Sequence, residues 1–225
     1  MKSLIEGETE KRLNRAQMEL AQRDVPVLIV FEGGSGRVIS RVVNEIARSL
    51  EPRCVTYHHF DVMKSGPRAL ANMVEATPGK GEIALFDRSW YSMFLEKFNG
   101  VKGGLAEGLK VIRAFEEYLQ DNGTYLIKID LSVTPEAMKD YAEQYRPFTP
   151  LSGTFLSVDR IDRVKYWAMA DEMISGTDTD RAPWDRIQVG EIAETLNKVA
   201  EAIAGRFERC LKNAKWKAPS KHAVS

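Results

Sequence analysis

The feature that most constrains the fold of this chain is an alternation between short apolar runs and longer segments with helical periodicity. The first run, residues 25–31, reads VPVLIVF and leads straight into two glycines. Such runs are typical of strands buried on both faces, and strands that alternate with helices form parallel sheets between two helical layers. We therefore predict an α/β fold, a three-layer α/β/α sandwich around a mainly parallel five-stranded sheet. The expected strands are residues 25–31, 54–60, 82–86, 125–131 and 186–189, and the expected helices are residues 8–23, 37–50, 105–119, 159–175 and 192–207.

Size and charge narrow the class of protein further. The chain has 225 residues, 44% of them hydrophobic and 28% charged, and its 32 basic and 32 acidic side chains cancel. This balance is typical of a soluble globular protein and argues against one that binds nucleic acid. We expect a single domain over residues 1–213, with a lid-like segment at about 144–165, and then a basic, flexible tail at 214–225.

Cysteine content and hydropathy bear on where the protein works. Two cysteines are too few for a disulfide framework or a Cys-rich zinc module. The longest apolar run is too short to cross a bilayer, and the charged first residues do not resemble a signal peptide. We expect a cytoplasmic protein with no membrane partner.

The glycine-rich segment GGSG at residues 33–36 is a candidate phosphate-binding loop. Where a strand runs through glycines into a helix, backbone N–H groups and the helix N-terminus favour an anion. A Walker A loop also needs a lysine followed by Ser or Thr, and here Ile39 stands where the lysine would be, before Ser40. The glycines therefore predict either a phosphate loop or a simple tight turn.

A second candidate site follows the expected strand at residues 82–86, which ends in Asp87 and Arg88. An aspartate at the carboxyl end of a strand beside a phosphate loop suits Mg²⁺, and the arginine could brace a transferring phosphate. The alternative is an aspartate that caps the following helix. We expect this pair and the glycine loop to lie at adjacent strand ends, facing one cleft.

These residues resemble the polyphosphate kinase 2 family, P-loop kinases that move phosphate between inorganic polyphosphate and nucleoside mono- or diphosphates. The likeness is carried by GEIALFDRSWY at residues 81–91, FEG at 31–33, PGKG at 78–81 and APW at 182–184, and it runs in order over residues 13–211. It implies a P-loop kinase-like fold, Mg²⁺ as cofactor, and polyphosphate and a nucleotide as partners. It also implies a homo-oligomer, or a hetero-oligomer with an active homologue.

The sequence departs from the family pattern in the loop and in the lid. Ser35 stands at the family's Asp, Ile39 at its Lys and Met93 at one of its Arg positions, and residues 144–158 contain one cation, Arg146. A gapped alignment could place Arg37 over the missing Lys. Two hypotheses follow: a polyphosphate–nucleotide phosphotransferase, or a catalytically inactive relative that acts as a binding or assembly module.

The resemblance assigns a role to each candidate residue. Asp87 would be catalytic and the metal ligand, beside the catalytic Arg88 and Arg37, and Asp61 would contact the acceptor. The histidines at residues 58–59 have no third ligand at a metal-binding spacing and predict strand-end side chains. The expected phosphate-binding residues are Gly33, Gly34, Ser35, Gly36 and Arg146.

Overall fold

The computed structural model describes residues 4–34, 36–60, 68–98, 104–133 and 163–213. Within them, five strands form one sheet in the order β2-β3-β1-β4-β5, and every neighbouring pair is parallel. The predicted α/β class and the parallel five-stranded sheet are therefore confirmed. The strands are β1 (Val27–Gly33), β2 (Val55–His59), β3 (Ile83–Asp87), β4 (Tyr125–Ser132) and β5 (Trp184–Gln188).

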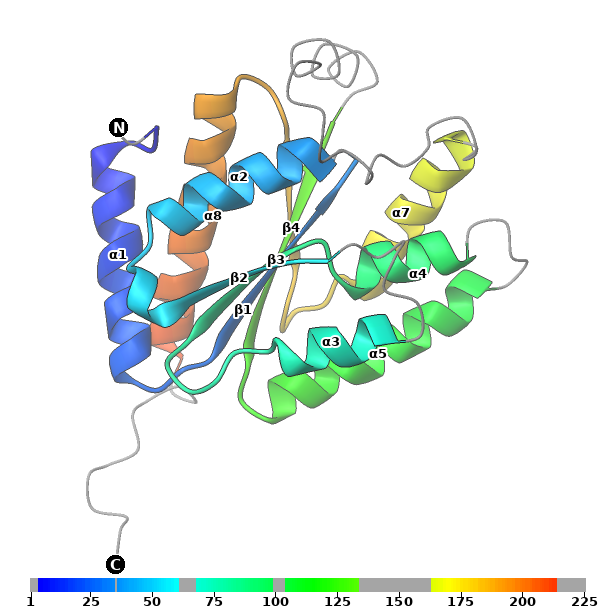
Figure 1. Ribbon diagram of the computed structural model, residues 1–225, viewed down its shortest axis with the longest axis horizontal. Helices are drawn as coiled ribbons and strands as arrows, with labels where there is room; N and C mark the ends of the chain where they lie inside the picture. Colours follow the sequence, from blue (N-terminus) through cyan, green and yellow to red (C-terminus); the bar gives the residue numbers. More distant parts are fainter. Residues whose placement is uncertain (1–3, 35, 61–67, 99–103, 134–162, 214–225) are drawn as a thin grey trace, which may run out of the picture.

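Helices cover both faces of the sheet (Figure 1). One layer consists of α1 (Gly7–Gln22), α2 (Gly36–Arg48) and α8 (Ile192–Lys212). The other layer consists of α3 (Ala69–Glu75), α4 (Trp90–Phe98), α5 (Gly104–Asp121) and α7 (Arg163–Thr177). The helices α3 and α4 are short and lack a long periodic stretch; α3 was not predicted, and α4 was expected only as the helix that Asp87 would cap in the alternative.

The central strand β1 explains why the apolar run is continuous. Ile29 and Phe31 join the core beneath α1, α2 and α8, whereas Leu28 and Val30 join the core on the opposite face. Successive side chains of a strand point to opposite faces, so a strand between two helical layers must be apolar at every position. Burial of both faces therefore agrees with the place of β1 at the centre of the sheet.

The helices on the α2 face follow the periodicity that predicted them. In α2, Val38, Val42 and Ile46 recur every four residues, and all three are buried. The long helix α8 begins at a side-chain cap, where Glu191 accepts hydrogen bonds from the N–H groups of Ala193 and Glu194. An N-cap stabilises the first turn of such a helix, and one apolar face packs the helix against the sheet.

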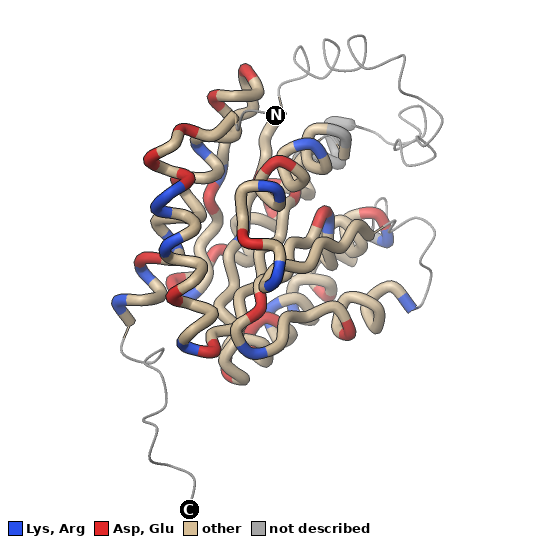
Figure 2. The backbone as a smooth tube through the Cα atoms, turned by 60° about the vertical axis from the view of Figure 1, so that its left-hand side comes forward, with Lys and Arg blue, Asp and Glu red and all other residues tan. Residues whose placement is uncertain are grey.

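Charged residues of both signs lie along α1 and α8, which pack side by side (Figures 1 and 2). Arg12 of α1 bridges to Glu201 and Glu208 of α8, at 2.8 and 3.0 Å. Among the described residues, no helix is both long enough and apolar enough to cross a membrane. The predicted tail at 214–225 and most of the predicted lid-like segment lie outside the described residues, so the predicted domain boundaries stay predictions.

Candidate functional site

The glycine loop and the Asp87–Arg88 pair lie side by side at the carboxyl ends of two neighbouring strands. Phe31 of β1 is in register with Asp87 of β3, and the Arg88 N–H donates to the Phe31 carbonyl at 3.1 Å. A Cβ added at Gly36 would lie 2.8 Å from Nη2 of Arg88, so the guanidinium packs against the start of α2. The arginine therefore reaches the loop from the adjacent strand.

Gly33 ends β1 in a conformation that a side chain could not adopt. Its φ is 151°, and a Cβ there would lie 2.2 Å from the carbonyl oxygen of Leu131 in β4. Only glycine allows such a close approach of two backbones. The first loop glycine is thus required by the packing of β1 against β4, whatever the loop binds.

The Asp87 carboxylate is buried and receives three side chains on one oxygen. Its Oδ2 lies 2.5 Å from Ser40 Oγ, 2.8 Å from the Tyr57 hydroxyl and 2.9 Å from Nδ1 of His59. Its Oδ1 is also buried and has no hydrogen-bond partner in the part of the chain that the structure describes. A buried carboxylate oxygen with no donor has the character of a cation ligand.

Strand parity explains how these four residues meet. His59 and Asp87 are in register across β2 and β3, so their side chains leave the sheet on the same face, as does that of Tyr57 two residues earlier. Ser40 approaches from α2, which covers that face. The carboxylate bonds to α2 and β2 rather than to the N–H groups of α4, so the helix-capping alternative is wrong.

Arg88 is buried and held in an unusual backbone conformation. Its φ of 65° lies in the left-handed region, which costs a non-glycine residue about 1–3 kcal/mol. Its guanidinium pairs with Glu96 of α4, with Nη1 and Oε1 3.4 Å apart. Because the strain must be offset by surrounding contacts, the fold holds this side chain in one place, against Gly36.

Sequence reasoning missed Glu32, a buried acid at the end of β1. Ser89 donates to its Oε1 at 2.7 Å, and Ser92 donates to its Oε2. Burial raises the pKa of Glu32 to about 7, although the two serines and nearby Arg88 oppose the shift. The sequence signals were an acid directly after an apolar run and its place in the FEG segment that carries the family resemblance.

Sequence reasoning also missed a buried ion pair on the opposite face of the sheet. Lys128 of β4 donates to Glu116 of α5 at 3.0 Å and to the Thr177 carbonyl of α7 at 2.6 Å. Glu116 also accepts from Trp90 at 3.3 Å and from the Tyr91 hydroxyl. Burial raises the pKa of Glu116 and lowers that of Lys128, because it disfavours both charged forms.

Several predicted site residues lie beyond what the structure describes. Ser35, Asp61 and Arg146 fall in undescribed segments, and Arg37 is placed only as backbone at the start of α2. Ile39, at the position of the family lysine, is 1% exposed and belongs to the core. The described residues therefore do not test the roles predicted for Ser35, Asp61, Arg146 and Arg37.

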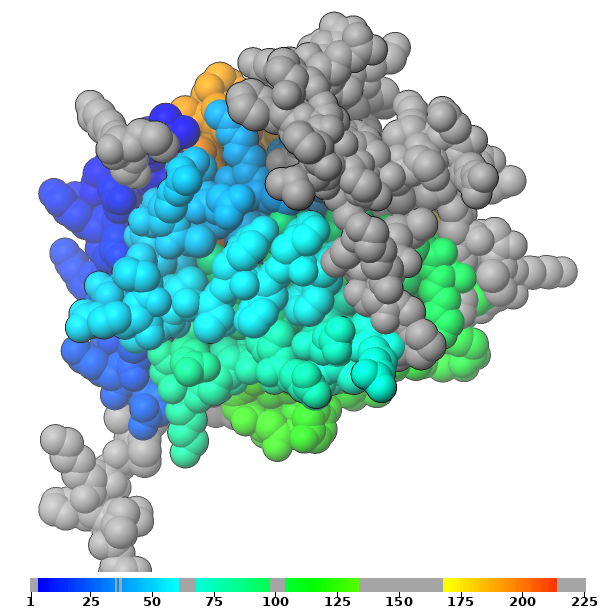
Figure 3. Space-filling view, in the orientation of Figure 1, coloured from blue at the N-terminus to red at the C-terminus, as the bar shows by residue number. Residues whose placement is uncertain are grey.

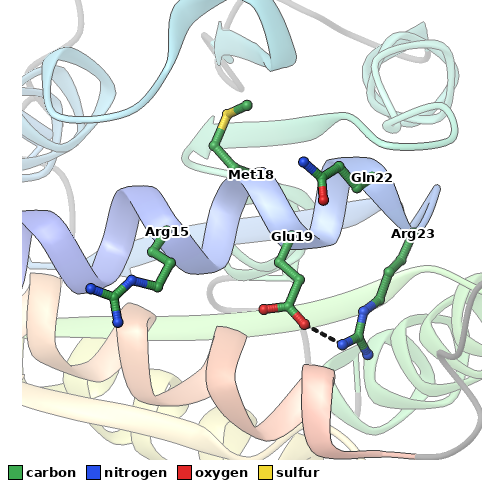
Figure 4. Close-up of a pocket in the computed structure, with 5 residues that line it drawn as sticks. All are labelled: Arg15, Met18, Glu19, Gln22 and Arg23. Carbon is green, nitrogen blue, oxygen red and sulfur yellow. Dashed lines mark hydrogen bonds and ion pairs between the residues drawn. The ribbon is translucent and has the colours of Figure 1, made fainter.

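A surface hollow lies elsewhere, along α1 (Figure 4). Arg15, Glu19 and Arg23 point toward the α8 side of the helix, whereas Met18 and Gln22 point away from it. Glu19 and Arg23 form an ion pair with each other. This hollow shares no residue with the Asp87 cluster.

A parallel sheet with a glycine loop after its central strand, and an acid–arginine pair after the neighbouring strand, defines an α/β protein whose candidate site lies at the carboxyl ends of its strands. The model of the family described as Polyphosphate kinase 2 (PPK2) matches residues 5–209, so the chain belongs to this family. The predicted resemblance is confirmed.

Individual relatives agree with the family match. The chain is 29% identical over 198 residues to ADP-polyphosphate phosphotransferase 3 of Rhizobium meliloti, covering 79% of this chain and 68% of that protein. It is 29% identical to a GDP-polyphosphate phosphotransferase of Mycolicibacterium smegmatis, covering 80% and 67%. The crystal structure of polyphosphate kinase 2 from Arthrobacter aurescens TC1 has the same fold, with a TM-score of 0.73 at 20% identity over 91% of this chain and 77% of that one.

Proposed function

We propose that this chain transfers phosphate between inorganic polyphosphate and a nucleoside mono- or diphosphate. The observation that carries the proposal is the Asp87 carboxylate, which contacts Ser40 at the start of α2 and keeps a buried oxygen without a donor. A hydroxyl and an aspartate at this place are what Mg²⁺ needs in a phosphate-loop protein. The names of the family and of the two relatives above support the choice of substrates.

The residues near the loop fit a Mg²⁺ ion. In the described ranges, no group of three or more His, Cys, Asp or Glu side chains could hold a metal on its own. Mg²⁺ does not need such a cage, because it is usually held by one or two carboxylates together with substrate phosphates and water. Asp87 and Ser40 would hold the ion, which when bound neutralises charge on the phosphates.

The remaining roles follow from position. The backbone of Gly33, Gly34 and Gly36 would cradle phosphate, and Arg88 would stabilise charge on the transferring group. Phosphoryl transfer depends mainly on positioning and on cationic electrostatics, so a neighbouring cation could replace the missing lysine, whereas the further departures at Ser35, at Met93 and in the lid are harder to offset. Arg37 is our candidate for the missing lysine. The roles of Ser35, Arg146 and Asp61, and the oligomeric partner, stay predictions.

The test is ATP formation from polyphosphate, ADP and Mg²⁺, with Asp87→Asn as the decisive variant. We expect Asp87→Asn and Arg88→Lys each to lower kcat at least about 100-fold, the size of effect seen when one electrostatic contact to a transition state is removed. Asp121→Asn is the matched control, since Asp121 is exposed and pairs with Arg181 on the surface. A rate unchanged by Asp87→Asn would refute the assignment.

Binding measurements distinguish the enzyme from the catalytically inactive alternative. Calorimetric titration with polyphosphate and with ADP would give heat but no turnover for a binding module, and both heat and turnover for the enzyme. Binding without turnover at any concentration of nucleotide would replace the proposed function with the alternative.

A further inference from the structure

The two oxygens of the Asp87 carboxylate differ in their contacts. Three side chains approach Oδ2, although an oxygen of a carboxylate offers about two lone pairs, while Oδ1 has no donor among the described residues. Their separations from Oδ2, 2.5–2.9 Å, are close to the distance of about 3 Å between neighbouring ligands of an octahedral ion. The groups around Oδ2 therefore have the spacing of a coordination sphere as well as that of hydrogen bonds, and Oδ1 of the same carboxylate adds an oxygen with no donor among the described residues.

The three contacting groups differ in chemistry. Ser40 and Tyr57 bring hydroxyls, but His59 brings a ring nitrogen, 2.9 Å from Oδ2. When the other ring nitrogen carries the proton, Nδ1 presents a lone pair and can bind a metal. Imidazole favours first-row transition ions, whereas Mg²⁺ takes oxygen ligands.

The His59 ring also lies between solvent and the buried carboxylate, on the path that an ion would take. β2 is an edge strand, and it forms the molecular surface between α2 and α3 (Figure 3). The side chain of His59 is 37% exposed and Tyr57 is 39% exposed, whereas the Asp87 side chain is fully buried. These two side chains therefore lie between solvent and the carboxylate.

We propose that His59 is a nitrogen ligand of the divalent cation at Asp87, and that the site consequently binds a transition ion such as Co²⁺ more tightly than Mg²⁺. This inference depends on the metal role proposed for Asp87. It replaces the expectation that His59 is an ordinary strand-end histidine.

The neighbouring histidine is a matched control. His58 points to the opposite face of the sheet, where its ring lies 6.2 Å from that of Phe60 and 5.7 Å from that of Phe86. Because strand side chains alternate, it cannot reach the face where Asp87 lies. His58→Gln therefore removes an imidazole next in sequence without touching the cluster.

The experiment uses the full, tag-free chain with Mn²⁺ as a spectroscopic probe, alone and with pyrophosphate, in a nitrogen-free buffer. Electron spin echo modulation detects a nitrogen bonded to Mn²⁺, and pyrophosphate supplies none. We expect nitrogen modulation in the wild-type chain and in His58→Gln, and none in His59→Gln. By calorimetry, His59→Gln should weaken Co²⁺ binding at least about 10-fold and Mg²⁺ binding less than about 2-fold.

The outcomes separate this inference from the proposed function. Mn²⁺ that binds without nitrogen modulation, and is lost in Asp87→Asn, would overturn the role of His59 and leave the metal role of Asp87 standing. Absence of bound Mn²⁺, or binding that survives Asp87→Asn, would overturn both. Modulation that persists in His59→Gln would also refute the inference. A wild-type spectrum without nitrogen modulation overturns the role of His59 even if a variant folds poorly.

Discussion

At the scale of single residues, Glu32 is the group whose chemistry is most altered by the fold. Its carboxyl is buried beside the glycine loop and accepts hydrogen bonds from Ser89 and Ser92. Its pKa of about 7 means that it holds a proton over a pH range in which the unfolded chain has lost it. The contribution of Glu32 to the free energy of unfolding therefore falls as pH rises from about 4.5 to 7.

Glu32→Gln should remove this pH dependence. We expect the stability of the variant relative to wild type to improve by up to about 3 kcal/mol between pH 4.5 and 8, at 1.36 kcal/mol for each unit of pKa shift. Urea unfolding at both pH values measures it, with Glu117→Gln on the exposed face of α5 as the control. If the stability difference between wild type and Glu32→Gln were the same at both pH values, the pKa of Glu32 would not be raised by the fold.

At the scale of elements, the buried ion pair joins four segments, of which three follow one another along the chain and the fourth, α7, comes later. Lys128 of β4 contacts Glu116 of α5 and the end of α7, and Glu116 contacts Trp90 and Tyr91 at the start of α4. Lys128 also lies 5.4 Å from the centre of the Trp184 ring. Since α4 follows Asp87 and Arg88 directly, this network fixes the helix that leaves the candidate site.

Lys128→Met should be strongly destabilising, because it leaves the Glu116 carboxyl without its cation. Breaking a buried pair by removing one partner costs about 3–5 kcal/mol, whereas replacing both partners is often far less harmful. We therefore expect Lys128→Met with Glu116→Gln to recover more than about 1 kcal/mol of this loss in chemical denaturation. Lys110→Met is the control, since Lys110 and Glu107 form an exposed pair worth at most about 1 kcal/mol. A double variant no more stable than Lys128→Met would contradict the expectation.

At the scale of the whole molecule, charge balance limits how a polyanion can be held. Basic and acidic side chains cancel over the chain, so its net charge supplies no overall attraction for polyphosphate. Binding must depend on local cations, and the sequence of the predicted lid and the helix after it offers Arg146, Arg160, Arg163 and Lys165. This set is small for a dense phosphate chain.

Polyphosphate binding should consequently be weak and salt-sensitive. We expect affinity to fall steeply between about 50 and 200 mM salt, with a shallower log–log slope than a relative with a fuller basic lid, because each neutralised phosphate adds to the slope. Arg146→Gln should reduce the slope by about 1, and Lys110→Gln on α5 should not change it. Titrations at three salt concentrations test this. Tight binding that ignores salt would refute it.

The parts of the site that sequence could predict are those fixed by neighbours in the chain. Asp87 and Arg88 end an apolar run, and strand ends of one parallel sheet meet at one edge, so their place beside the glycine loop followed from local pattern. Tyr57 and His59 could not be predicted as contacts of Asp87, since that depends on β2 pairing with β3 in one register. A slip of one residue would have turned both side chains to the other face.

The sequence by itself determined the class of the fold and the order of its elements, because hydrophobic periodicity is a local property and both faces of a parallel sheet must be buried. Tertiary structure alone decided what each polar group became. Only folding brings Ser40, Tyr57 and His59 to one oxygen of Asp87, buries Glu32, and joins Lys128 to Glu116. The physical reason is that pKa and coordination depend on burial and on contacts across elements, which no spacing along the chain encodes.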